Sequence, residues 1–136
     1  MFRYFNRLFS NRDASALAEF SLVLPVLITL LVGTIEAGLL FQLKNNMTYH
    51  TRNVARDVAL GNLTGAEATT ELTRLLNTYA DLSYTVKIAV PDPDVEADTD
   101  VVVTVTLPQA DVESYALTGL LVTGDFSSSA TMRSLE

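Results

Sequence analysis

The pattern of hydrophobic and polar positions changes twice along the chain, and it opens with an apolar run. The sixteen residues from Phe20 to Ile35 carry no charge, and an extension to Phe41 adds Glu36 as the only charged residue. As an α-helix, the segment from Phe20 to Phe41 is about 33 Å long, which matches a hydrocarbon core of about 30 Å. The run therefore predicts a transmembrane helix, in which Pro25 is tolerated.

The helical spacing continues beyond the apolar run. No proline interrupts the chain between Pro25 and Pro91, and one stripe recurs at helical spacing, made of Met47, Thr51, Val54, Ala55 and Val58. We therefore expect one helix from about Ala14 to Leu60, ended by Gly61. A second helix is predicted after Thr64, with Glu67 as its capping-box partner. Its apolar face would consist of Ala68, Leu72, Leu75, Leu76 and Tyr79.

Strict alternation replaces the helical spacing from Leu82 onward. A first strand is predicted with one face made of Leu82, Tyr84, Val86, Ile88 and Val90. A second strand places Val101, Val103, Val105 and Leu107 on one face, and the two strands should pair as a hairpin. A third, "FSSSATMR", places Phe126, Ser128, Ala130 and Met132 on one face. Between them, the segment from Asp111 to Leu121 has a spacing typical of a helix or an ordered loop, at Val112, Tyr115, Ala116 and Leu120.

Together these elements predict an α+β fold. A long N-terminal helix, transmembrane in its first half, would be followed by a second helix and a small antiparallel sheet of about three strands. The predicted organisation is a basic leader over residues 1–14, the transmembrane half of the helix over residues 15–41, and an external α+β domain over residues 42–136. About 95 residues outside the membrane are enough for a modest core.

Composition and charge narrow the function classes. The net charge of −7 argues against nucleic acid as a partner, because phosphate binding needs clustered Lys and Arg. The chain has no Cys, and its only His is His50, which excludes thiolate and multi-histidine metal sites. His50 also has no nucleophile motif beside it, so it is interpreted as a solvent-facing or packing residue. We predict a protein that is not an enzyme and that has neither a cofactor nor a small-molecule substrate.

The predicted hairpin loop is acidic, with alternating carboxylates at Asp92, Asp94, Glu96, Asp98 and Asp100. Calcium prefers several oxygen ligands, so this loop is a candidate site. The EF-hand spacing fails, however, and residues two apart in an extended loop do not converge. The favoured interpretation is a solvated, self-repelling loop.

The start of the apolar run raises three hypotheses. A basic segment with Arg3, Arg7 and Arg12 precedes it, which predicts a cytoplasmic N-terminus. A cleaved secretory signal and a plain signal anchor both fit this layout. The third hypothesis explains Glu19: a basic leader, a few small residues, Glu-Phe and a long apolar helix resemble a class III signal of the type IV pilin kind.

That resemblance implies a cut between Ala14 and Ser15, although Ala14 stands where such leaders usually carry Gly. Glu19 would then be the fifth mature residue. In pilins this glutamate neutralises the N-terminal ammonium of a neighbouring subunit, so Glu19 and Phe20 are the expected assembly residues. The alternative is that Glu19 only marks the membrane interface.

The stretch "AEFSLVLPVLITLLVGTIEAGLLF" resembles the start of the TadE-like family of the tight-adherence (Tad/Flp) pilus system. The residues that carry the resemblance are Glu19, Phe20, Pro25, Gly33 and Glu36. "HTRNVARDVALG" resembles the family's next helix, and "SSSATMRSLE" resembles its closing strand.

The resemblance implies a pseudopilin, minor pilin or assembly factor of the Flp pilus, a machine of secretion and cell adhesion. Its partners would be other pilin and pseudopilin subunits, the inner-membrane pilus platform and, transiently, a prepilin peptidase. It would cross the bacterial inner membrane once, with its C-terminal domain in the periplasm or at the cell surface within a pilus. The alternatives are an uncleaved membrane scaffold of the same machine and a secreted binding domain released by signal peptidase.

Glu36 lies about 25 Å along the helix from Glu19, near the outer end of the span. One interpretation is that its side chain extends to the headgroups. The other is a polar contact with a partner helix, because Gly33 and Ala37 form a pair of small residues that permits close helix approach.

Overall fold

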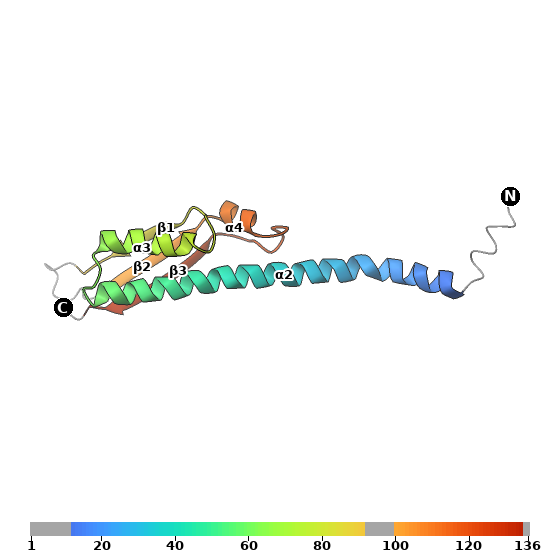
Figure 1. Ribbon diagram of the computed structural model, residues 1–136, viewed down its shortest axis with the longest axis horizontal. Coiled ribbons are helices and arrows are strands. Elements are labelled where there is room, and N and C mark those ends of the chain that lie inside the picture. The colour runs from blue at the N-terminus through green and yellow to red at the C-terminus, as the bar shows by residue number, and fades with distance from the viewer. Residues whose placement is uncertain (1–11, 92–99, 135–136) are drawn as a thin grey trace. The chain divides into compact units, whose positions relative to one another are not determined.

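A computed structural model describes residues 12–91 and 100–134, with the side chains of residues 12–15 left out. It confirms the predicted α+β class. The described residues form one long helix, two shorter helices and three strands, and the strands make one antiparallel sheet (Figure 1). The chain divides into two compact units, which meet in sequence at Ile35 and Glu36. The acidic loop residues 92–99 lie outside the described residues.

The first helix, α2, runs from Arg12 to Ala59, close to the predicted bounds. It ends as predicted at Gly61, whose φ of 73° is a left-handed conformation that glycine adopts without steric cost. The Gly61 amide donates to the Val58 carbonyl at 3.0 Å, and the Asn62 amide donates to the Asp57 carbonyl at 2.9 Å. These two bonds form a Schellman motif, which satisfies carbonyls that the helix end leaves free.

The second helix, α3, spans Gly65–Asn77 and begins with the predicted capping box. The Thr64 amide donates to Glu67 Oε2 at 2.9 Å, and the Glu67 amide donates to Thr64 Oγ1 at 3.4 Å. Ala68, Leu72 and Leu76 are buried as predicted. Tyr79 is a correction: α3 ends at Asn77, so Tyr79 leaves the helical register and its side chain is 55% exposed.

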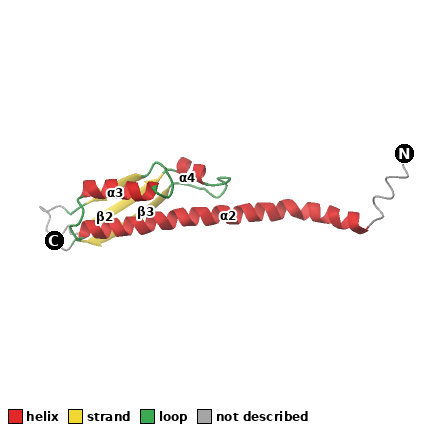
Figure 2. Ribbon diagram, viewed as in Figure 1, coloured by secondary structure: helices red, strands yellow, loops and turns green. Residues whose placement is uncertain are grey.

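The sheet has the order β1-β2-β3, with both pairs antiparallel (Figure 2). Strands β2 (Asp100–Leu107) and β3 (Phe126–Arg133) match their predicted positions, and β1 with β2 forms the predicted pair. Strand β1 covers only Thr85–Ala89, and Val90, predicted on its inner face, is 52% exposed. Its start is set by β2: Thr85 pairs with Thr106, so the register would bring Ser83 opposite Pro108, which has no amide to donate.

One face of the sheet forms the core of the unit that starts at Glu36. Alternate β2 residues Val101, Val103, Val105 and Leu107 are at most 1% exposed, and they cluster with α2, α3 and α4 residues that include Met47, Leu72, Leu76 and Val112. Beside β3, Lys44 of α2 donates to the Ser127 carbonyl, and the Thr48 and Ser128 hydroxyls lie 3.3 Å apart. This packing holds the second half of α2 against the domain.

The segment after β2 contains a short helix, α4, over Gln109–Tyr115. Val112 is buried, in line with the helical spacing, but the helix ends before Leu120. Leu120 is 80% exposed in the loop that follows, so the helical alternative holds up to Tyr115 and the loop alternative beyond it. Gly119, just before it, has a φ of 69°, which the loop requires and which a side chain would strain.

Candidate functional site

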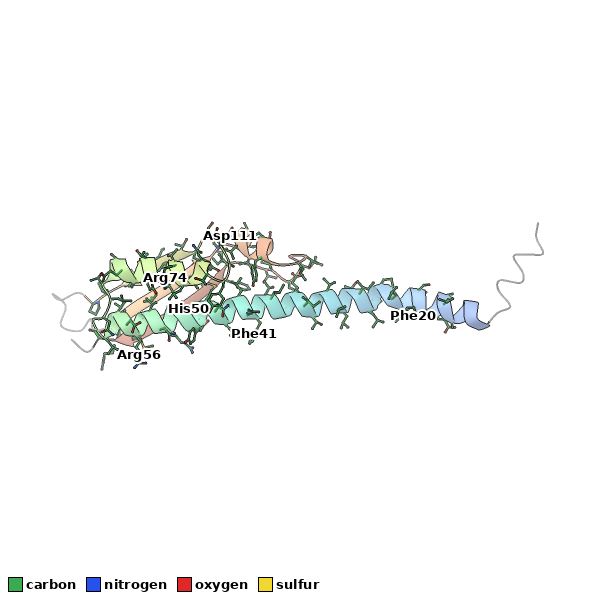
Figure 3. All side chains as sticks on the ribbon, viewed as in Figure 1. Phe20, Phe41, His50, Arg56, Arg74 and Asp111 are labelled. Atoms are coloured by element: carbon green, nitrogen blue, oxygen red, sulfur yellow. The ribbon has the colours of Figure 1, made fainter. Side chains whose placement is uncertain are left out.

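The part of α2 up to Ile35 exposes an apolar surface. Among the described residues, α2 is the one helix that is long and apolar enough to cross a membrane, by length and composition. Large side chains are exposed all around it, among them Phe20, Leu22, Val26, Leu30 and Leu31 (Figure 3). A helix that is apolar on every side is stable when it is surrounded by lipid or by other apolar helices.

The hydroxyl groups in this part of α2 bond to the helix itself. Ser21 donates to the Ala18 carbonyl, Thr29 to the Pro25 carbonyl and Thr34 to the Leu30 carbonyl, each at 2.8 Å. Lipid offers no hydrogen-bond partners, so an unpaired hydroxyl there costs free energy. These three bonds make the polar residues of the run compatible with a lipid environment.

The predicted cleavage and assembly residues lie in the first turns of α2. Ala14 and Ser15 are part of the first helical turn, and Glu19 and Phe20 follow within the same helix. The Glu19 side chain is exposed and has no hydrogen bond or ion pair with any residue that the structure describes. Its carboxylate is therefore free to meet a group from outside the chain.

Gly33 and Ala37, the predicted helix-packing pair, present little side-chain bulk on α2. Ala37 is exposed, and a Cβ built on Gly33 would meet nothing within 4 Å. Among the described residues nothing occupies the space beside Gly33, which leaves room for a second helix to approach closely.

Glu36 is fully buried, unlike the residues next to it on α2. Its Oε2 accepts hydrogen bonds from the Thr118 amide at 3.1 Å and from the Thr118 hydroxyl, and its Oε1 accepts from the Leu121 amide at 3.4 Å. The carboxylate thus fastens the loop that follows α4 to the first residue of the second unit.

Sequence reasoning missed the partners of Glu36. Thr118 and Leu121 lie more than 80 residues downstream, in a loop whose spacing carries no sign of such a contact. The available signal was chemical: a carboxylate in an apolar setting needs several donors, and an irregular segment has free amides to supply them.

His50 is buried on the inner side of α2, which agrees with a packing role. Its ring centroid lies 5.2 Å from that of Tyr49 and 5.5 Å from that of Tyr79, and its Nε2 has no hydrogen-bond partner. Burial lowers the pKa of His50 from its ordinary value of 6.5. This environment favours a neutral imidazole.

The described residues contain no group of three or more His, Asp or Glu side chains that could hold a metal ion. Of the candidate calcium ligands, Asp92, Asp94, Glu96 and Asp98 lie outside the described residues. Asp100 is the first residue of β2, where it pairs with Arg133 of β3 in the sheet register.

Comparison with known proteins gives one match, and it lies in the helix α2 described above. No curated protein and no solved structure matches the chain significantly. The family model described as TadE-like protein matches residues 14–56, which include the exposed apolar helix, Glu19 and Glu36. The match confirms, over these residues, the resemblance to the TadE-like family found in the sequence.

Proposed function

We propose that this chain is a non-catalytic pseudopilin, minor pilin or assembly factor of a Tad (Flp) pilus apparatus, which acts through association of membrane helices. The observation that carries the proposal is that one segment has two properties. Residues 14–56 match the TadE-like family, and the same residues contain the apolar helix surface that the described chain leaves uncovered.

In this proposal α2 crosses the bacterial inner membrane once. Arg3, Arg7 and Arg12 precede the apolar run, and positive charge on the cytoplasmic side of a span supports a cytoplasmic N-terminus. The unit that begins at Glu36 then lies in the periplasm and can enter a pilus. Its partners are other pilin-type subunits and the pilus platform.

Glu19 is the proposed assembly residue. A prepilin peptidase removes Met1 to Ala14, and the new amino group at Ser15 of one subunit pairs with Glu19 of a neighbour. An unpaired carboxylate at the edge of lipid is unfavourable, so the pair selects the correct register between helices. The Glu19 side chain is exposed and has no partner among the described residues, which supports this role.

Substitution of Glu19 tests the proposal. Glu19→Ala makes the span more apolar, so insertion into the membrane should be unchanged or improved. Recovery of partner pilins with the tagged chain should nevertheless fall, on the order of a hundredfold, because the partner amine is left unpaired in an apolar setting. Glu19→Gln should fail similarly, since it keeps the shape and loses the charge.

Ser21→Ala is the matched control, because the Ser21 hydroxyl bonds only to its own helix. It should leave both insertion and partner recovery unchanged. If Glu19→Ala recovers partners and supports piliation as well as Ser21→Ala does, the assembly role of Glu19 is wrong, and the uncleaved scaffold becomes the better account.

A further inference from the structure

We propose that the loop after α4, residues 116–124, is a second membrane contact, whose leucines enter the outer surface of the bilayer that α2 crosses. This inference rests on the part of the proposed function that places α2 in a membrane. It goes beyond that function by assigning the loop a lipid ligand of its own.

The loop exposes large apolar side chains without any charge. Leu117 is 57% exposed, Leu120 is 80% exposed and Leu121 is 49% exposed. The sequence of the loop, "ALTGLLVTG", has no Asp, Glu, Lys or Arg, although the whole chain is acidic. Three exposed leucines within five residues of one loop indicate an apolar ligand, since scattered single residues would need no explanation.

The hydrogen bonds to Glu36 locate the loop along α2. Thr118 and Leu121 are hydrogen-bonded to Glu36, which directly follows the uncharged run from Phe20 to Ile35. Sixteen helical residues extend about 24 Å, which covers most of a hydrocarbon core of about 30 Å. A span that occupies this stretch ends at Ile35, so the loop stands at the level of the headgroups and the first part of the acyl chains.

The backbone of the loop is already paired, which suits a lipid environment. Glu36 accepts from the amides of Thr118 and Leu121. The Leu120 amide donates to Thr118 Oγ1 at 3.3 Å, and the Val122 amide donates to the Gly119 carbonyl at 3.2 Å. An irregular segment can enter the membrane interface when its amides are satisfied internally, because lipid supplies no acceptors.

These observations favour lipid over another subunit as the occupant. Binding to the membrane surface requires only an apolar surface at the correct depth, and the hydrogen bonds to Glu36 hold the loop at that depth.

A tryptophan probe tests the proposal directly, because the chain contains no Trp. The full-length Leu120→Trp variant is reconstituted into phosphatidylcholine vesicles with and without brominated acyl chains, which quench nearby indole fluorescence. Leu27→Trp, in the exposed apolar part of α2, is the positive control. Leu60→Trp, 43% exposed in the turn after α2, is the matched control far from the loop in sequence.

The proposal expects Leu120→Trp to emit at shorter wavelength than Leu60→Trp and to be quenched by bromines near the headgroups. Leu27→Trp should be quenched most by bromines deep in the acyl chains, and Leu60→Trp should not be quenched. Glu36→Ala in the Leu120→Trp background should reduce the quenching at position 120, since the loop loses its fastening. The same substitution should leave the quenching of Leu27→Trp unchanged.

Three results would overturn the inference, and they can be told apart. Quenching of Leu27→Trp but not of Leu120→Trp keeps the membrane span and removes the loop contact; a shift to shorter wavelength at position 120 without lipid quenching would instead assign the loop to protein contact. No quenching at either position removes the membrane premise, and both the inference and the proposed function then fail.

Discussion

At the scale of single residues, His50 is a titratable group whose environment makes a prediction about pH. Its ring packs against Tyr49 and Tyr79, its Nε2 is unpartnered, and burial lowers its pKa. In the unfolded chain the imidazole takes up a proton below about pH 6.5, whereas in the folded chain it stays neutral to lower pH. The free energy of unfolding should therefore fall as the pH drops from about 6.5 toward the folded pKa, and it should not change for this reason above 6.5.

Thermal unfolding of the full chain in detergent, followed through the circular dichroism of the domain between about pH 8 and pH 5, measures this effect. The variant His50→Phe keeps a ring between the two tyrosines and removes the titration. The midpoint of the wild-type protein should fall relative to that of His50→Phe on acidification. Parallel curves for the two proteins would show that His50 does not titrate differently in the folded state.

Residue identity predicted some features of the site and missed others. Glu19 and Phe20 are recognisable because a carboxylate before an apolar run is unusual, and the family match includes them. The contacts of Glu36 were not predictable, because they depend on how a loop more than 80 residues away returns to α2. Local spacing contains no information about such a long-range contact.

At the scale of elements, the capping box of α3 is the local feature that the sequence specified most completely. Thr64→Ala removes the side-chain acceptor for the Glu67 amide and leaves that end of the helix without its cap. The expected loss is about 1 kcal/mol in the free energy of unfolding. Urea unfolding should show a lower midpoint with an unchanged slope.

Thr70→Ala is the control for this prediction. Thr70 is exposed within α3, and its hydroxyl donates to the Ala66 carbonyl of the same helix at 3.2 Å. Alanine is a better helix former than threonine, so this variant should be as stable as the wild type or slightly more stable. Equal midpoints for Thr64→Ala and Thr70→Ala would mean that the cap contributes nothing measurable.

The other elements differ in how far local pattern decided them. Strands β2 and β3 lie where alternation placed them. One face of β2 is buried along the whole strand, and one face of β3 is buried at its centre and half-buried at its ends. Strand β1 starts later than its pattern predicts, because the partner strand ends before Pro108. Helical spacing predicts α4 correctly as far as Tyr115. Beyond that residue, the turn at Gly119 and the contacts with Glu36 determine the path of the backbone.

At the scale of the whole molecule, the sequence predicted the fold class from changes in period alone, and the structure confirms it. Sequence pattern placed the outer end of the span at residue 41, while the structure begins its second compact unit at Glu36. Leu40 and Leu43 continue the apolar character of α2, but they are buried in the domain core. Hydropathy cannot separate a residue that faces lipid from one that faces a protein core, because both positions require apolar side chains.

The central claim is that α2 holds a processed, pilin-type subunit in the membrane. The most direct test is to determine the N-terminus of the chain by mass spectrometry after isolation from native membranes. The account predicts a membrane-bound chain that begins at Ser15, with Glu19 as its fifth residue. A chain that begins beyond Ala37 and is recovered outside the membrane fraction would contradict it, because the helix that carries both the family match and the proposed assembly residues would be absent.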